Sequence, residues 1–210
     1  MTNGRSTIVV LVVLVCSLAM WGCQGGTNGQ DKPAEQRFRF TVTACPHEAH
    51  VEFGETLADI NKLAGGPGVF HITVGDLAGF HPDSIELNRA EINTHFGGST
   101  IWYPVVGNHD MEEVHDMVWL RGEYNNGNGR RTPLKNFTNQ DGPATSKETM
   151  YSWDHGDAHF TVLNVYWDGK KDAAYFDGRA GKALLAWLVR DLDANTKPYV
   201  FVIAHEPAYP

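Results

Sequence analysis

Residues 102–110 read Trp102-Tyr103-Pro104-Val105-Val106-Gly107-Asn108-His109-Asp110. An apolar run typical of a buried strand ends here at a glycine, and the polar residues that follow can bind a metal or move a proton. Asp76 follows the apolar run 69–74 through Gly75 in the same way, and His205 follows 199–203. His47 comes after a first alternating stretch at 38–42. Because ligands bind at the carboxyl ends of strands in open α/β sheets, we expect these side chains to form one site.

The segments between these strands have helical periodicity. Apolar residues favour helices around 57–64 and over 85–96, the second preceded by Asp83 and Glu86 at the spacing of a capping box. Alternating strands and helices indicate a sheet with parallel strands. Further along, we predict a long surface loop over 121–146, a hairpin over 151–165, a helix over 184–192 and a strand over 199–203 that is buried on both faces.

The length and charge of the chain limit its class. It has 210 residues and a formal net charge of −8, with no internal repeat, so residues 38–210 are interpreted as one domain. An acidic surface repels phosphate backbones, which disfavours general nucleic-acid binding. An anionic substrate would then need a local positive centre, and a bound metal could supply one.

The N-terminus resembles a bacterial lipoprotein signal. A basic residue, Arg5, precedes a short apolar run over 8–20 that is followed by Gly22 and Cys23. We therefore predict a signal peptide over residues 1–22, lipid attachment to Cys23 and a flexible linker over residues 23–37. Plain secretion with an unused Cys23 is the alternative. Either reading places the mature protein outside the cytoplasm, anchored to a bacterial membrane or secreted.

Taken in order, Val74-Gly75-Asp76, Gly107-Asn108-His109-Asp110 and Ile203-Ala204-His205 resemble the motifs of the calcineurin-like metallophosphoesterase superfamily. That family surrounds two metal ions with Asp-x-His, Gly-Asp, Gly-Asn-His-Asp/Glu, a later His and a final Gly-His-x-His. The resemblance implies an α/β fold: a four-layer α/β/β/α sandwich of two mixed β-sheets flanked by helices, incomplete at the C-terminus of this sequence.

The resemblance also implies a site for two divalent ions, which could be manganese, iron or zinc. Asp76 would bridge both ions through its carboxylate, His47 would bind one, and Asn108 and His205 would bind the other. Two such ions can hold a bridging hydroxide for attack on a phosphate ester. Taken alone, Asp76 and Asn108 could instead be turn residues, and His205 a structural histidine.

Two further residues of this motif are implied to act on the substrate rather than on the metals. His109 would assist as an acid, donating a proton to the leaving oxygen or a hydrogen bond to a phosphoryl oxygen. Asp110 would orient His109 and keep it protonated. The alternative for Asp110 is a solvated turn residue.

The sequence departs from the family pattern at its first and last motifs. Cys45-Pro46-His47 stands where the family has Asp-x-His. Cys45 is therefore either a substitute ligand that favours soft ions such as zinc or a damaged site. Glu48 or His50 could compensate, although neither stands at the matching position. No Gly-His-x-His follows His205 before Pro210, so we expect a domain truncated before that motif and weak metal retention.

These observations predict a metallophosphoesterase that hydrolyses a phosphomonoester or phosphodiester outside the cytoplasm. A phosphate ester is the expected substrate, and a lipid on Cys23 is the only expected contact with a membrane. The alternative is a catalytically impaired or non-catalytic surface lipoprotein that binds a phosphorylated ligand or partner with the same fold. A third possibility, an unrelated secreted α/β domain, requires the residues at the strand ends to be scattered in space.

Overall fold

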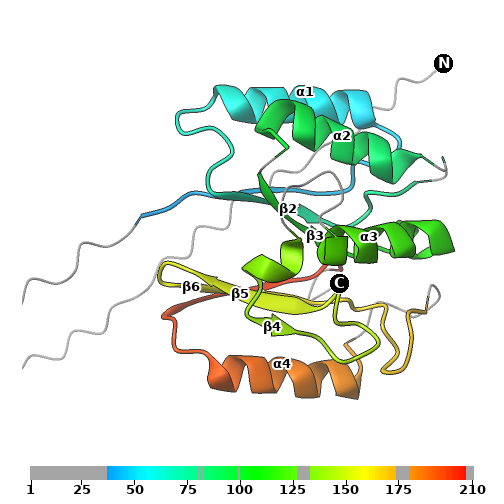
Figure 1. Cartoon of the computed structure of the whole chain (residues 1–210), viewed down its shortest axis with the longest axis vertical. Helices are drawn as coiled ribbons and strands as arrows, with labels where there is room; N and C mark the ends of the chain where they lie inside the picture. The colour runs from blue at the N-terminus through cyan, green and yellow to red at the C-terminus, as the bar shows by residue number, and fades with distance from the viewer. Residues whose placement is uncertain are drawn as a thin grey trace, which may run out of the picture.

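A computed structural model describes residues 37–79, 81, 83–98, 100–126, 133–173 and 180–206. Figure 1 shows four layers in the order helices, sheet, sheet, helix. Helices α1 and α2 cover the first sheet, the second sheet packs beneath it, and α4 covers the outer face of the second sheet (Figure 1). The predicted four-layer α/β/β/α sandwich is confirmed.

The first sheet contains β1 (Thr41–Thr43), β2 (Phe70–Val74) and β3 (Ile101–Val105) in that spatial order. Helices α1 (His50–Lys62) and α2 (Ser84–Phe96) connect them. Both strand pairs are parallel, so this sheet is not mixed across its described strands, contrary to the prediction. Parallel pairing follows from the helical crossovers, which return each strand to the same end of the sheet. The polar residues after β1, β2 and β3 therefore share one edge.

The second sheet contains β4 (Gln140–Asp141), β5 (Tyr151–His155), β6 (Ala158–Val162) and β7 (Tyr199–Ile203). The β4–β5 and β5–β6 pairs are antiparallel and β6–β7 is parallel, so this sheet is mixed as predicted. The hairpin and the helix α4 (Lys182–Ala194) are also confirmed. The crossover through α4 places the end of β7 at the same edge as the ends of the first sheet's strands.

Aromatic side chains fill the space between the two sheets. Tyr103 of β3 stacks on Trp153 of β5 with ring centroids 3.6 Å apart, and Trp153 in turn stacks on Phe160 of β6 at 5.0 Å. Phe160 stacks on Phe201 of β7 at 4.8 Å. Large buried rings contribute strongly to core stability, so this stack joins the two sheets into one domain.

Three local predictions are wrong. β7 is not buried on both faces: Phe201 and Ile203 pack into the core between the sheets, but Val200 and Val202 are 42% and 49% exposed. Within the described part of the chain, strand β7 pairs only with β6, and no helix covers its outer face. Asp83 is the N-cap of α2 but makes no capping hydrogen bond, so the capping box does not form. The strand expected over 38–42 is shorter than predicted. β1 covers only Thr41–Thr43, and Phe38 packs against the core from outside it.

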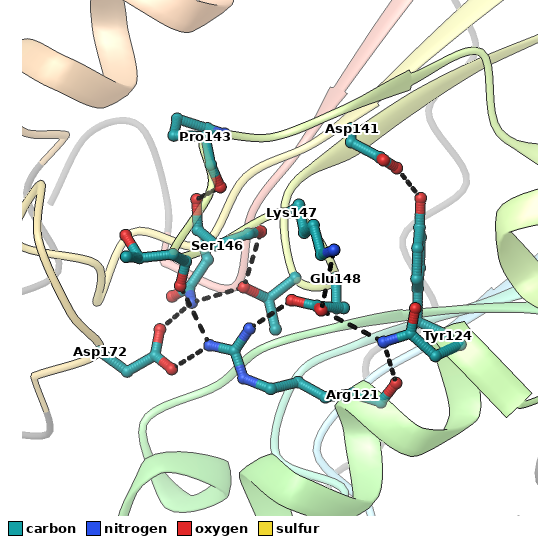
Figure 2. Close-up of polar contacts among 12 residues, drawn as sticks. Arg121, Tyr124, Asp141, Pro143, Ser146, Lys147, Glu148 and Asp172 are labelled. Carbon is teal, nitrogen blue, oxygen red and sulfur yellow. Dashed lines mark hydrogen bonds and ion pairs between the residues drawn. The ribbon is translucent and has the colours of Figure 1, made fainter.

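The predicted loop over 121–146 is largely structured. Helix α3 (Val114–Asn126) extends through its start, and the described part after it forms a short 3-10 helix (Leu134–Phe137) and β4. Figure 2 shows contacts that tie later segments to α3: Tyr124 Oη donates to Asp141 of β4, and the guanidinium of Arg121 donates to Glu148 Oε2 at 2.6 Å and also to Asp172. These are long-range contacts that local composition does not reveal.

The predicted signal peptide over residues 1–22, Cys23 and all but the last residue of the linker lie outside the described residues. Among the described residues, no helix is both long enough and apolar enough to cross a membrane.

Candidate metal centre

Asp76 lies between two histidines that come from different sheets. Its Oδ2 is 3.3 Å from His47 Nε2 and 3.2 Å from His205 Nε2. His47 follows β1, Asp76 follows β2 and His205 follows β7, so the predicted convergence at one edge occurs. The other oxygen of Asp76, Oδ1, accepts the backbone N–H of His109 at 3.1 Å. Oδ2 therefore remains directed at the two imidazoles.

Cys45 belongs to the same group. Its Sγ, a nitrogen of His47 and an oxygen of Asp76 all lie within 4.8 Å of one another. The thiol is exposed at the surface, and Asp76 is buried. This group contains Cys45 rather than Glu48 or His50, the neighbouring replacements considered above. We call Cys45, His47, Asp76 and His205 the Asp76 cluster.

The backbone around the Asp76 cluster is strained. Among the described residues, the non-glycine positions with positive φ are Cys45 (51°), His47 (46°) and Asp76 (54°). A non-glycine residue in this region costs roughly 1–3 kcal/mol and persists only when its surroundings hold it. Here Cys45 N donates to Gly75 O at 3.2 Å and His47 N donates to Asp76 O at 3.1 Å. The strain thus coincides with three residues of the Asp76 cluster, as is common at functional sites.

Two glycines allow the turns to approach one another. A β-carbon on Gly75, whose φ is +78°, would collide with the ring of His205, and one on Gly107 would collide with Asp76. Both positions therefore exclude any larger residue. This explains why a glycine directly precedes the polar residue at the ends of β2 and β3.

Asp76 and His205 form a charged pair. Burial opposes ionisation of Asp76, but the contacts with His205, the His109 N–H and His47 outweigh it and hold the pKa of Asp76 below its ordinary value. Burial likewise opposes protonation of His205, but its bonds to Asp76 and to the Val74 carbonyl raise its pKa to about 9. His205 Nδ1 lies 2.9 Å from Val74 O, which directs Nε2 toward Asp76. In this arrangement a proton on His205 balances the negative charge of Asp76.

The acidic groups around the cluster also act on Cys45. Partial burial of this exposed residue, together with the charges of Asp76, Asp110 and Glu206, raises the pKa of its thiol to about 11. Acidic groups thus surround the cluster on several sides, and such a potential attracts a cation.

His109 lies beside the cluster. Its ring contacts that of His47 edge to face with centroids 4.6 Å apart, and its Nδ1 is 3.0 Å from Glu112 Oε1. Glu112 is not among the site residues predicted from the sequence. The signal available was its spacing, because residues three apart in a helical turn are neighbours.

Asp110 makes contacts that were not predicted. Its carboxylate accepts the backbone N–H groups of Gly107 and Ala78, both at 2.7 Å, and of Asp76 at 2.9 Å. Burial raises the pKa of Asp110 to about 6, against the effect of these bonds. Asp110 therefore joins the turn after β2 to the turn after β3, and its orientation of His109 stays a prediction. The alternative of a solvated turn residue is wrong, because Asp110 is fully buried.

The remaining predicted residue, Asn108, is half-buried at the turn after β3. None of the contacts within the described part of the chain joins its side chain to the Asp76 cluster. Another asparagine was missed: Asn88 of α2 donates to His47 O at 2.6 Å and to Leu77 O at 2.7 Å. Asn88 thereby holds the backbone of both turns from the side of α2. Because it is 41 positions from His47 in the sequence, no local pattern predicts this contact.

The donor set suits divalent ions. A carboxylate oxygen flanked by imidazole nitrogens on both sides offers one position next to His47 and Cys45 and a second next to His205. Imidazole and carboxylate bind zinc, manganese and iron, and thiolate adds affinity for softer ions. The residues therefore fit a dinuclear centre built around Asp76.

Comparison with known proteins agrees with this chemistry. The family model described as calcineurin-like phosphoesterase matches residues 38–210, which is most of the chain. A search of curated proteins finds no match.

Proposed function

The chain belongs to the calcineurin-like phosphoesterase family, and from this membership and the geometry of the Asp76 cluster we propose that it hydrolyses a phosphate monoester or diester with two divalent ions. The observation that carries the proposal is the position of Asp76 Oδ2, 3.3 Å from His47 Nε2 and 3.2 Å from His205 Nε2. Such a carboxylate can bridge two cations. The acidic, strained surroundings support the same reading.

The chain's own residues divide into two ligand sets. His47, Asp76 and Cys45 would hold one ion, and Asp76, His205 and Asn108 would hold the other. When bound, such ions activate water and offset the charge that develops on the phosphoryl group. Asn108 would need to turn its amide toward the cluster, because the described contacts do not place it there. Asp110 keeps the two turns in register through its three backbone bonds.

We assign proton donation to His109. Its Nδ1 lies 3.0 Å from Glu112 Oε1, so a carboxylate faces this edge of the ring. The ring lies against His47, which places it at the border of the cluster, where a bound ester would present its leaving oxygen. Donation to that oxygen helps most with a poor alkoxide leaving group, so a diester remains a candidate substrate.

A second candidate function is binding without turnover. Cys45 favours it, because a thiol at the family's carboxylate position removes a hard oxygen donor. A surface protein that binds a phosphorylated ligand with this site would retain metal but would not release product.

Hydrolysis of p-nitrophenyl phosphate and bis-p-nitrophenyl phosphate, measured with added manganese or zinc, separates these functions. We expect hydrolysis of at least one ester that is lost on chelation and falls about 10²–10⁴-fold in His109→Ala. His95→Ala is the matched control, since His95 pairs with Glu91 on α2 and lies outside the Asp76 cluster. Full metal loading without hydrolysis of either ester would favour the binding function.

We also propose that the protein acts outside the cytoplasm, held to a membrane by a lipid on Cys23. The signal-like pattern over residues 1–22 supports this proposal. Membrane fractionation with the Cys23→Ser variant tests it. We expect the wild-type protein in the membrane fraction and the variant in the soluble fraction. Wild-type protein that is already soluble would contradict the anchor and leave plain secretion.

A further inference from the structure

Cys45 has a backbone conformation that is unfavourable for a cysteine. Its φ of 51° lies in the left-handed region, which glycine adopts without strain and which asparagine tolerates. Its backbone N–H is fixed by Gly75 O at 3.2 Å, so the strain is built into the turn. The thiol is not buried in the apolar core, where a structural cysteine usually lies, but is exposed at the edge of the Asp76 cluster.

The two sides of Asp76 offer different donors. On the His47 side the available atoms are a sulfur, an imidazole nitrogen and a carboxylate oxygen, all within 4.8 Å of one another. On the His205 side they are an imidazole nitrogen and a carboxylate oxygen, 3.2 Å apart, and within the described residues His205 is not part of the group that contains Cys45. Soft thiolate ligands select zinc and similar ions, and nitrogen and oxygen donors accept manganese or iron as well.

From this asymmetry we propose that Cys45 is a thiolate ligand that makes the His47 side of the centre selective for a soft divalent ion such as zinc. The proposal rests on the proposed function, because it concerns the same cluster. On binding, the thiol proton passes to solvent and the sulfur bonds to the ion. The His205 side keeps its preference for nitrogen and oxygen chemistry, so the two positions differ in metal selectivity.

Cobalt provides a spectroscopic test, because a thiolate bound to Co²⁺ gives a charge-transfer absorption in the near ultraviolet that nitrogen and oxygen ligands do not give. The full-length protein, kept reduced and freed of metal, is titrated with Co²⁺ alone. We expect the band to develop as one cobalt ion binds and to be absent in Cys45→Ser. It should persist in the double variant Cys16→Ser/Cys23→Ser, which removes the other cysteines of the chain.

Competition between zinc and manganese tests selectivity without reference to activity. In equilibrium dialysis against both metals, we expect Cys45→Asp to shift the bound ratio toward manganese by at least about tenfold relative to the wild type. Cys45 is exposed, so neither variant removes core packing, and thermal unfolding is used to check that both variants fold. The cobalt spectrum of the wild-type protein tests the ligand without relying on the folding of a variant.

Three results would overturn the proposal. Cobalt that binds without the band would remove Cys45 as a ligand, as would a band that survives in Cys45→Ser. An unchanged metal ratio in Cys45→Asp would remove its role in selectivity. If these results accompany hydrolysis of a phosphate ester by the manganese-loaded protein, the proposed function stands and only the role of Cys45 fails. If no divalent ion binds, both fail.

Discussion

The two sheets each bury a histidine on the side that faces their helices, and the two histidines differ in charge. His71 of β2 contacts Phe96 of α2, with ring centroids 5.1 Å apart, and is fully buried. His159 of β6 contacts Asp191 of α4 at 3.0 Å and is 4% exposed. The two residues thus occupy equivalent layers of the sandwich, so their environments can be compared directly.

His71 is surrounded by hydroxyl groups. Its Nδ1 lies 2.9 Å from Thr41 Oγ1, and its Nε2 lies 3.1 Å from Thr43 Oγ1 and 3.3 Å from Thr73 Oγ1. Burial, and to a lesser extent the positive charge of Arg89, lowers the pKa of His71 to about 3. The ring is therefore neutral at physiological pH.

His159 is surrounded by carboxylates. Its Nδ1 lies 2.8 Å from Asp154 Oδ1 and its Nε2 lies 3.0 Å from Asp191 Oδ2. Burial opposes protonation, but the two acidic partners outweigh it and raise the pKa of His159 above its ordinary value. Burial lowers the pKa of both histidines, so their partners decide the charge. Hydroxyl groups leave His71 neutral, whereas the negative charges of two carboxylates favour the protonated form of His159.

Removing the carboxylate of Asp191 should give the largest effect. Its oxygens accept from Ser152 Oγ at 2.6 Å and from Thr161 Oγ1 at 2.7 Å, in addition to contacting His159. Asp191→Asn removes a charge from a buried ionic network and leaves His159 with a single acidic partner. We expect the free energy of unfolding at neutral pH to fall by about 3–5 kcal/mol, measured by urea denaturation.

Asp193→Asn on the same helix is the matched control, because Asp193 is exposed. Its effect should stay within about 0.5 kcal/mol. A loss below about 1 kcal/mol in Asp191→Asn would mean that the network carries no charge, and the contrast between the sheets would disappear.

His71 should make the protein sensitive to acid. Below its ordinary pKa of about 6.5, the unfolded chain binds a proton at this residue that the folded chain does not bind until about pH 3. Stability at this position is therefore complete above about pH 6.5 and falls with decreasing pH, by up to about 1.4 kcal/mol per unit. In His71→Gln, the dependence of unfolding free energy on pH between about 6 and 4 should be shallower by that amount.

The slope of the unfolding free energy against pH distinguishes the titration of His71 from its contribution to packing. A packing defect in His71→Gln lowers stability equally at every pH and leaves the slope unchanged. Parallel curves for the wild type and the variant would show that His71 is protonated inside the folded protein, contrary to the role of its hydroxyl partners.

The sequence predicts most of the fold because its apolar runs, helical periodicity and glycines act locally. The strands ending near Val74, Val105 and Ile203 and the helix α4 follow from such patterns. The exposed outer face of β7 does not, since a run of apolar residues carries no information about what covers each face. The end of α3 is also not predictable from local patterns. Its composition favours a loop from residue 121 onward, but Arg121 ties this part of the helix to later segments.

The location of the candidate site was predictable, but its supporting contacts were not. His47, Asp76 and His205 follow strand ends, and the topology then brings them together. The direction of a side chain within a turn depends on backbone angles that the sequence does not show. For that reason the three backbone N–H groups that face the carboxylate of Asp110 were not predicted. The contact of Glu112 with His109 was not predicted either.

Replacing a hydroxyl beside His71 should cost less than replacing a carboxylate beside His159. Thr73 Oγ1 lies 3.3 Å from His71 and accepts Trp102 Nε1–H at 2.9 Å. Thr73→Val keeps the shape of the side chain and removes this acceptor, so we expect a loss of about 1–2 kcal/mol in urea denaturation. Thr94→Val, at an exposed position on α2, is the control and should change stability by less than about 0.5 kcal/mol. A loss as large as that of Asp191→Asn would mean that dipoles and charges contribute equally here.

The smallest expected effect is the pH dependence of His159, and its sign is opposite to that of His71. The folded pKa of His159 is raised, so its stabilising contribution is complete below the unfolded pKa of about 6.5 and is lost as pH rises through the folded value. Relative to His159→Gln, the wild-type protein should therefore lose stability as the pH rises above about 6.5, by less than about 1.4 kcal/mol per unit. Because His71 is neutral throughout this range, the two histidines can be measured in separate pH windows of one protein. Parallel curves above about pH 6 would mean that Asp154 and Asp191 do not hold a proton on His159.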